Sequence, residues 1–250
     1  MRRTRRRTDA SDDRSSARAR RDRADERDDG RVDRDVRRHA PRTLELGRSR
    51  AMLGYASPKK VVVLGIQGAG KTSVVERVKD VYGASTRGLR PEQIISTVGM
   101  NIAKAPAGVN LPVELIFWDL GGAFGLRGIW ESYFKDADAC AYVVDGADEG
   151  SLEESMVELE RALRNAEFGK AMPVLVLSAK SDLSGPEGLE MVRASCDDVF
   201  ARVDGTASKR SWRVLAVNAN TGLGLRPAVE WLAHELTSSE PSLLSSLFSF

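Results

Sequence analysis

The amino-acid sequence predicts an α/β fold, with a doubly wound, mainly parallel six-stranded sheet and helices on both of its faces. Three observations lead to this prediction. Short apolar, β-branched runs alternate with longer stretches of helical pattern along most of the chain. The stretches between runs are long enough for the crossover helix that parallel pairing requires. The runs are also apolar throughout, which is typical of strands covered from both sides.

Strands are expected at five apolar runs, and helices between and after them. The predicted strands are residues 61–64, 113–118, 139–144, 174–178 and 214–217. A sixth strand is expected at residues 101–104, antiparallel to 113–118 across a turn that contains Pro106, Gly108 and Asn110. The predicted helices are residues 72–81, 151–165, 186–202 and 223–236. With 42% hydrophobic residues among 250, the chain can bury one well-packed core.

The ends of the chain differ in composition from its middle. Residues 1–42 hold sixteen arginines and ten acidic residues, and apart from Met1 their only sizeable apolar side chains are Val32 and Val36. Such a segment cannot bury enough apolar surface to offset its conformational entropy, so a disordered tail is expected. Residues 43–58 are expected to form a linker or short amphipathic segment, 59–237 the folded domain, and 238–250 an apolar C-terminal tail.

Both tails have more than one interpretation. The basic tail is interpreted as a solvated extension, and the alternative is contact with RNA or acidic lipid head groups, since arginine forms bidentate bonds with phosphate. Nucleic acid is not expected at the domain itself. The C-terminal tail either frays or packs on the domain, or else contacts a partner or a membrane surface.

The sequence shows no targeting peptide and no membrane-spanning segment, and the cellular location is predicted from these observations. The interleaved acids of residues 1–42 argue against a transit peptide, and no signal-peptide segment follows Met1. No apolar run approaches the about 18 residues that a membrane span needs. The two cysteines, Cys140 and Cys196, indicate neither a disulfide framework nor a metal cluster. A monomeric cytoplasmic protein, or one peripheral to membranes, is therefore expected.

The most specific motif is Gly-Ile-Gln-Gly-Ala-Gly-Lys-Thr at residues 65–72, which matches G-x-x-x-x-G-K-[ST] between a predicted strand and a predicted helix. Glycines let the loop bend so that backbone N–H groups surround a phosphate at a helix N-terminus. Lys71 is expected to reach the β- and γ-phosphates, and the Thr72 hydroxyl to bind Mg²⁺. A glycine-rich turn without ligand would give no reason for Lys71 followed by Thr72. The candidate nucleotide-binding residues here are Gly65, Gln67, Gly68, Ala69, Gly70, Lys71, Thr72 and Ser73.

Two weaker motifs select among nucleotides. Asp119-Leu-Gly-Gly122 follows a predicted strand as D-x-x-G, where the carboxylate can hold a Mg²⁺-bound water and the Gly122 N–H can sense a γ-phosphate. Lys180-Ser-Asp182 follows another strand. The Asp182 carboxylate can accept from N1–H and the exocyclic amine of guanine, while the Lys180 stem lies along the purine. Each motif alone is common, but in this order they favour GTP and GDP over ATP.

With these motifs placed, the chain resembles the Arf-like small GTPases. Residues 118–122 and 130–134 match the W-D-x-G-G and W-x-x-Y-F patterns of their switch II, residues 97–101 resemble switch I, and 218–222 resemble the late base-contacting loop. The resemblance covers about residues 59–236. It implies a GTP/GDP conformational switch in which Thr97 binds Mg²⁺ and the Ala219 N–H contacts guanine. It also implies effectors at switch I and II, an exchange factor, a GTPase-activating protein, and a role in vesicle or ciliary traffic.

The chain departs from the family pattern where hydrolysis is concerned. The water-positioning Gln is Ala123 here, and loss of such a group costs on the order of 10²–10³ in rate. Lys71 and Thr97 then remain as the candidate catalytic residues. Slow GTP hydrolysis is expected; the alternatives are a pseudo-GTPase scaffold that binds GTP or nothing, and, less consistent with the motifs, an ATP-using enzyme.

Two further departures concern the base and the membrane. The Asn expected before Lys180 is Ala179, so weaker GTP binding is expected, while Asp182 still excludes ATP. Arg2 stands where Arf proteins carry a myristoylated Gly, so this form of membrane attachment is not expected.

Overall fold

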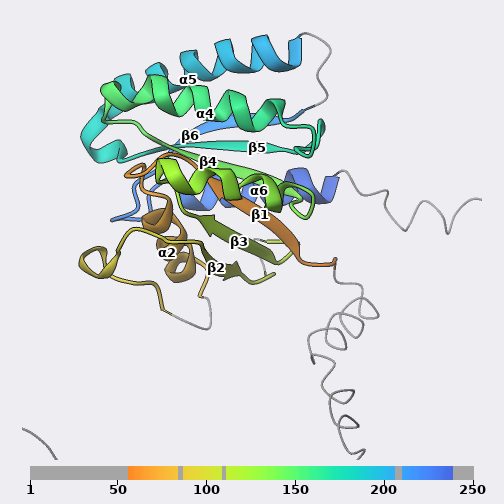
Figure 1. The fold of residues 1–250 in the computed structure, drawn as a ribbon. Helices are drawn as coiled ribbons and strands as arrows, with labels where there is room; N and C mark the ends of the chain where they lie inside the picture. Colours follow the sequence, from red (N-terminus) through yellow and green to blue (C-terminus); the bar gives the residue numbers. More distant parts are fainter. Residues whose placement is uncertain (1–55, 84–86, 109–110, 206–209, 239–250) are drawn as a thin grey trace, which may run out of the picture. The chain divides into compact units, whose positions relative to one another are not determined.

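The structure, a computed structural model, describes residues 56–83, 87–108, 111–205 and 210–238. The predicted N-terminal tail, nearly all of the predicted linker, the C-terminal tail except for Ser238, and Asn110 lie outside the described residues. Six strands form one sheet in the order β2-β3-β1-β4-β5-β6 (Figure 1). Their bounds are β1 Lys59–Leu64, β2 Met100–Ala105, β3 Leu115–Leu120, β4 Ala139–Asp145, β5 Val174–Ala179 and β6 Trp212–Ala216. All pairs are parallel except β2 with β3, so the predicted fold class is confirmed.

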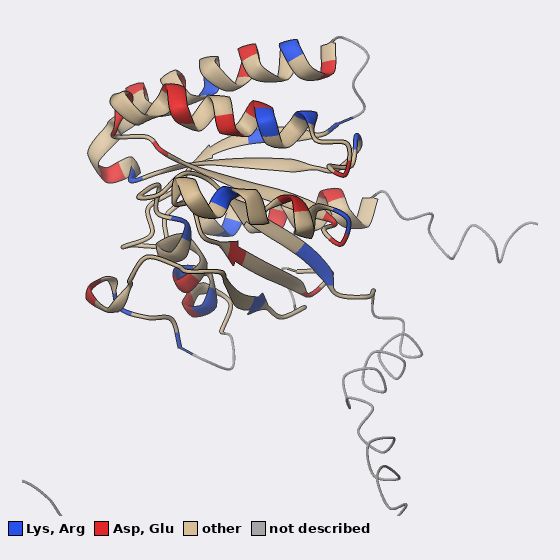
Figure 2. Ribbon diagram, in the orientation of Figure 1, with Lys and Arg blue, Asp and Glu red and all other residues tan. Residues whose placement is uncertain are grey.

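Helices cover both faces of the sheet. Helices α2 (Lys71–Val81) and α6 (Leu225–Ser238) pack on one face, and α4 (Leu152–Arg164) and α5 (Ser181–Asp204) on the other (Figure 1). Successive side chains of a strand point to opposite faces. Val61 and Val63 of β1 therefore join the α2/α6 cluster, while Val62 and Leu64 join the α4/α5 cluster. The described charged residues lie mainly on helices and loops (Figure 2).

Four short helices were not predicted from the sequence. They are α3 (Glu131–Phe134) and the 3₁₀ helices η2 (Pro91–Gln93), η3 (Phe124–Ile129) and η4 (Glu149–Ser151). Each is too short to show a helical period. Helix α3 is nevertheless anchored, because the side chains of Trp130 and Phe134 are buried in the α4/α5 cluster.

The helix predicted from Pro186 is present as the main part of α5, and one further turn precedes it. The Lys180 carbonyl accepts from the N–H groups of Leu183 and Ser184 and closes this turn, and Gly185, whose φ of 61° is not helical, separates it from the helix that starts at Pro186. One predicted boundary near the site is wrong. Strand β3 is shifted by two residues toward the C-terminus from its predicted range. Asp119 thus lies within the strand, since it pairs with both β1 and β2.

The topology gathers the loops at one edge. All five parallel strands end at the same side of the sheet, and the residues that follow β1, β4, β5 and β6 emerge there. In open α/β sheets ligands bind outside these carboxyl ends.

Candidate functional site

The loop between β1 and α2 is shaped by its glycines. Gly65, Gly68 and Gly70 have φ values of 139°, 83° and 96°, a conformation that side-chain-bearing residues rarely adopt. At Gly65 a Cβ would also lie 2.3 Å from the Val143 carbonyl oxygen. Helix α2 starts directly after Gly70. Its N-terminus therefore opens onto the loop, as an anion site requires.

Lys71 lies in the wall of a cavity of about 210 Å³. Its Nζ donates to the Ile66 carbonyl over 2.8 Å, and the residue is 6% exposed. Burial lowers the pKa of Lys71 to about 8, although the charge of Asp119 opposes the shift. Among the described residues, this carbonyl is the one hydrogen-bond acceptor of the buried ammonium, which is therefore suited to pair with an anion in the cavity. The lining comprises Gln67, Gly68, Gly70, Lys71, Thr72, Ser73, Ile94, Ile95, Ser96, Thr97, Gly122 and Ala123.

Three oxygen-bearing side chains meet beside Lys71. The hydroxyls of Thr72 and Thr97 lie 2.9 Å apart, and each donates to Asp119 Oδ2, over 2.7 and 3.3 Å. The other oxygen, Oδ1, is buried and has no hydrogen-bond partner within the described ranges. Burial raises the pKa of Asp119, while the two hydroxyl hydrogen bonds and the Lys71 charge oppose the rise.

This oxygen cluster fits a magnesium ion. Mg²⁺ prefers oxygen ligands and is usually bound by one or two protein groups together with phosphates and water. No group of three or more His, Cys, Asp or Glu suited to a metal occurs among the described residues. The hydroxyls of Thr72 and Thr97 and the unpartnered Asp119 oxygen therefore form the set that could hold such an ion.

The D-x-x-G segment is packed against the glycine-rich loop and tied to α4. A Cβ at Gly122 would lie 2.3 Å from Lys71 Nζ and 2.4 Å from the Gly65 carbonyl oxygen, so the two backbones are in close contact. Arg127, which is 5% exposed, donates through Nε to the Gly122 carbonyl (2.9 Å). Its other nitrogens reach Glu158 (3.1 Å) and Glu154 (2.6 Å) of α4.

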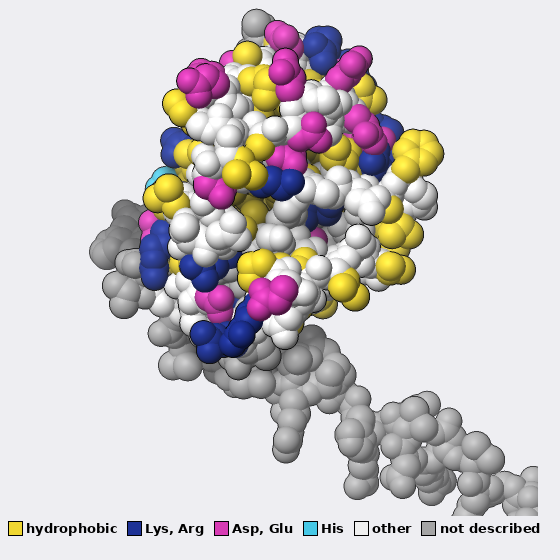
Figure 3. Space-filling view, turned by 90° about the vertical axis from the view of Figure 1, so that its left-hand side faces the viewer, with side chains coloured by type: hydrophobic (Ala, Val, Ile, Leu, Met, Phe, Trp, Pro, Cys, Tyr) yellow, Lys and Arg dark blue, Asp and Glu magenta, His cyan; other side chains and the backbone are white. Residues whose placement is uncertain are grey.

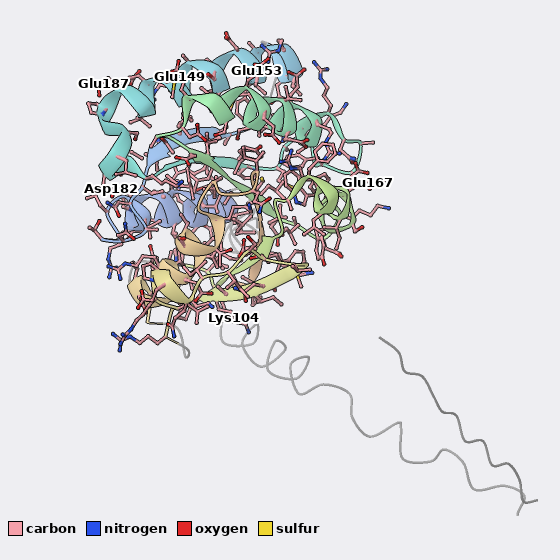
Figure 4. All side chains as sticks on the ribbon, turned by 60° about the vertical axis from the view of Figure 1, so that its left-hand side comes forward. Lys104, Glu149, Glu153, Glu167, Asp182 and Glu187 are labelled. Atoms are coloured by element: carbon pink, nitrogen blue, oxygen red, sulfur yellow. The ribbon has the colours of Figure 1, made fainter. Side chains whose placement is uncertain are left out.

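The predicted base-contacting residues lie at the same edge. Lys180 follows β5 with a left-handed φ of 56°, and its Nζ pairs with Asp145 Oδ2 at the end of β4. Asp182 lies exposed at the start of α5 (Figure 4). The loop after β6 that carries Ala219 is held by Asn218, whose Oδ1 accepts from two following N–H groups.

The structure does not bring every predicted residue into one cavity. Gly65, Ala69 and Asp119 are buried and are not among the residues that line the cavity. Ala219 lines an adjacent cavity. The two departures from the family pattern lie at the phosphate end: Ala123 lines the cavity, and the buried Ala179 lies 3.6 Å from a Cβ placed at Gly70.

Asp145, Arg127 and Glu158 were missed as functional candidates. Asp145 directly follows the predicted strand 139–144, and Arg127 is one of 38 basic residues in the chain. Their contacts with Lys180, Gly122 and α4 depend on tertiary packing, which leaves no local sequence signal.

A glycine-rich phosphate loop, a threonine–aspartate oxygen cluster and a lysine–aspartate base motif at one sheet edge define a P-loop nucleotide-binding protein of the small GTPase class. The model of the ADP-ribosylation factor (Arf) family matches residues 48–236, and the chain belongs to this family.

Individual relatives agree with this assignment. ADP-ribosylation factor-related protein 1 of Bos taurus is 31% identical over 172 residues, which are 69% of this chain and 82% of the relative. ADP-ribosylation factor-like protein 3 of Saccharomyces cerevisiae is 31% identical over 182 residues, 73% of this chain and 87% of the relative. The solved structure of the Arl6 BBS3 small GTPase from Trypanosoma brucei with bound nucleotide analogue GppNp has a TM-score of 0.58 at 23% identity. It covers 74% of this chain and 100% of its own, and it shows the likeness of fold.

Family membership establishes the coarse activity. The chain is an Arf-like small GTPase that binds guanine nucleotide, in a family whose members act as GTP-dependent switches with effectors, exchange factors and GTPase-activating proteins. Within the described part of the chain, none of the helices combines the length and apolar character needed to cross a membrane.

Proposed function

We propose that this chain is a GTP/GDP switch with slow intrinsic hydrolysis, whose nucleotide phosphates occupy the cavity at Lys71. The observation that carries the proposal is the convergence of Thr72, Thr97 and Asp119 beside the glycine-rich loop, with oxygen–oxygen distances of 2.7 to 3.3 Å. These three residues come from α2, from the loop before β2 and from β3. Such a cluster links the loop that binds phosphate to the segments that must respond to it.

Each part of the phosphate site has a proposed role. Lys71 binds the β- and γ-phosphates, and backbone N–H groups of the loop and of the first turn of α2 bind the remaining phosphate oxygens. Thr72 and Thr97 would hold Mg²⁺, with Asp119 accepting from its water. The ion supplies positive charge that neutralises the phosphates. The loop residues in this role are Gly65, Gln67, Gly68, Ala69, Gly70 and Ser73.

Switch II is proposed to couple the presence of the γ-phosphate to the position of α4. The Gly122 N–H would contact the γ-phosphate, and the Gly122 carbonyl is bonded to Arg127, which reaches Glu154 and Glu158. A shift of Gly122 between nucleotide states therefore moves or breaks these bonds. Two-state rearrangement of such a segment is how small GTPases change partners.

Slow hydrolysis follows from Ala123, since a methyl group cannot orient the attacking water. Lys71 and Thr97 still stabilise charge on the phosphates. We expect Ala123→Gln to raise the single-turnover rate of GTP hydrolysis by on the order of 10²–10³. Phe124→Gln, which adds the same amide one residue later at a side chain 82% exposed, is the matched control. An Ala123→Gln variant no faster than the parent would contradict the assignment.

The base is proposed to lie against Lys180, Asp182 and the Ala219 N–H. Ala179 lacks the side chain that the family places there, so affinity falls by about 0.5–1.5 kcal/mol. Asp182→Ala should remove the preference for GDP over ADP in a competition assay. Glu187→Ala, an acid on the same helix (Figure 4), should not. Retention of the preference in Asp182→Ala would refute the base assignment.

A second candidate function is a scaffold that holds GTP permanently or binds no nucleotide, and Ala123 and Ala179 favour it. One experiment separates the switch from the scaffold. The purified chain is incubated with Mg²⁺, and the nucleotide released by denaturation is identified at successive times. Accumulating GDP supports the slow switch, while retained GTP or an empty site supports the scaffold. By family analogy, the switch would act in vesicle or ciliary traffic at the surface of membranes.

A further inference from the structure

A second cavity adjoins the phosphate cavity, and its lining is basic. Its volume is about 290 Å³, and it shares Ser73 and Ile94 with the phosphate cavity. Arg77 of α2 lines it, together with Arg87 and Arg90 of the loop between α2 and β2. The ribbon of that loop carries basic positions in Figure 2, and Lys and Arg side chains gather on the lower part of the face shown in Figure 3. None of these arginines has a role in the switch described above.

The charges of this cavity are not balanced. Asp80 is the one carboxylate in its described lining. Asp80 accepts the Gly88 N–H through Oδ1 (3.0 Å), and its Oδ2 lies 3.7 Å from the Arg77 guanidinium. The Nε of Arg77 is buried and has no hydrogen-bond partner in the part of the chain that the structure describes. Among the described residues, the side chains of Arg87 and Arg90 form no hydrogen bond or ion pair.

An anion of high charge density suits this lining. With Asp80 counted, the three guanidinium groups leave an excess of two positive charges around one small cavity, and these repel one another unless a further negative group lies between them. Arginine presents planar pairs of N–H donors that match phosphate oxygens. A phosphate group would take up the unpartnered donors and neutralise the excess charge.

The position of the cavity indicates what carries the phosphate. Ala219 and Asn220, in the loop proposed to contact guanine, line one part of it, and Ser73, at the phosphate cavity, lines another. A nucleotide with its 5′-phosphates at Lys71 and its base at Ala219 must pass its ribose between these two points. A phosphate in the arginine-lined cavity is then within reach of the ribose hydroxyls.

We propose that Arg77, Arg87 and Arg90 form a subsite for a phosphate carried on the 2′ or 3′ oxygen of a bound guanine nucleotide. The inference rests on the proposed function, because the ribose is located by the phosphate and base sites. It adds a ligand class: guanine nucleotides phosphorylated on the ribose as well as on the 5′ oxygen.

The test compares GDP with its 3′-diphosphate and 2′-phosphate derivatives, using the full chain and calorimetry with Mg²⁺. At least one derivative is expected to bind about tenfold more tightly than GDP or better. Arg87→Ala combined with Arg90→Ala should abolish that preference and leave GDP affinity unchanged. The matched control, Lys104→Ala with Arg193→Ala, removes two exposed charges outside the cavity and should retain the preference (Lys104 is labelled in Figure 4).

Three results would overturn the inference. In the first, GDP and both derivatives bind equally, which leaves the proposed function intact. In the second, the arginine variant loses GDP affinity to the same extent as derivative affinity. In the third, inorganic pyrophosphate binds the GDP-loaded chain with a free energy as large as the gain in binding free energy of the ribose-phosphorylated derivative over GDP. Attachment to the ribose is then not needed. If neither GDP nor its derivatives bind at all, the proposed function fails, and this inference fails with it.

Discussion

Replacing Arg127 by leucine should destabilise the domain strongly, because this side chain joins switch II to α4. The substitution removes the hydrogen bond to the Gly122 carbonyl (2.9 Å) and the ion pair with Glu158 (3.1 Å), whose side chain is only 10% exposed. Removing one partner of a buried pair costs about 3–5 kcal/mol, because the other charge stays buried. Arg161, at 2.9 Å, still pairs with Glu158 and offsets part of this cost. We therefore expect a loss of about 3 kcal/mol, the low end of that range.

The lost pair with Glu154 should matter little, although its distance is the shorter one (2.6 Å). The Glu154 side chain is 53% exposed, and exposed pairs are worth about 0–1 kcal/mol. Glu154→Ala is thus the matched control, with an expected loss below about 1 kcal/mol.

Urea unfolding at a fixed GDP concentration measures these differences, with the fixed ligand keeping its stabilisation comparable between variants. For a urea slope of about 1–3 kcal/mol per molar, the midpoint of Arg127→Leu should fall by about 1–3 M. Combining Arg127→Leu with Glu158→Leu removes the uncompensated charge and should recover part of the stability. The reasoning is refuted if Arg127→Leu unfolds at the parental midpoint, or if the double variant is no more stable than the single one.

Two further predictions follow from close packing. Gly122→Ala places a Cβ 2.3 Å from Lys71 Nζ and 2.4 Å from a backbone oxygen, so it should lower the free energy of unfolding, measured in urea, by about 1–3 kcal/mol and weaken GDP binding. Gly125→Ala is the control, because a Cβ there has no described atom within 4 Å. Equal effects of the two substitutions would contradict the close contact at Gly122. Burial raises the pKa of the Cys196 thiol to about 12 and also raises that of Cys140. Because the thiolate is the reactive form, neither cysteine should react with a disulfide reagent at pH 8 until the domain unfolds; rapid labelling of the folded chain would show that one of them is accessible.

The fold was predictable where local pattern and tertiary environment agree. The β-branched runs became the five parallel strands, and the turn containing Pro106 and Gly108 correctly indicated the antiparallel β2. The departures involve long-range contacts. Glu76 is a charged residue in a helical pattern, yet it is 1% exposed, because it accepts from Leu89 N–H and Asn101 of distant segments. Neither contact can be read from the residues around Glu76.

The candidate site divides in the same way. Lys71, Thr72 and Asp119 lie in motifs whose spacing fixes them relative to a strand end, so their meeting at one edge was predictable. The buried partner of Arg127, Glu158, lies 31 residues away in sequence, and the partner of Lys180, Asp145, lies 35 residues away. Which acid meets which base depends on the packing of α4 and on the order of the strands. The sequence alone does not specify either of these.

At Lys180 the requirements of fold stability conflict with those of nucleotide recognition. Among the described residues it is the one non-glycine position with positive φ, a conformation that costs an L-residue about 1–2 kcal/mol. Glycine would adopt this turn without strain, but it would lose both the ammonium that pairs with Asp145 and the stem proposed to cover the base. The chain thus retains a lysine at the turn where β5 meets α5, a place where selection for folding alone would favour a residue with no side chain.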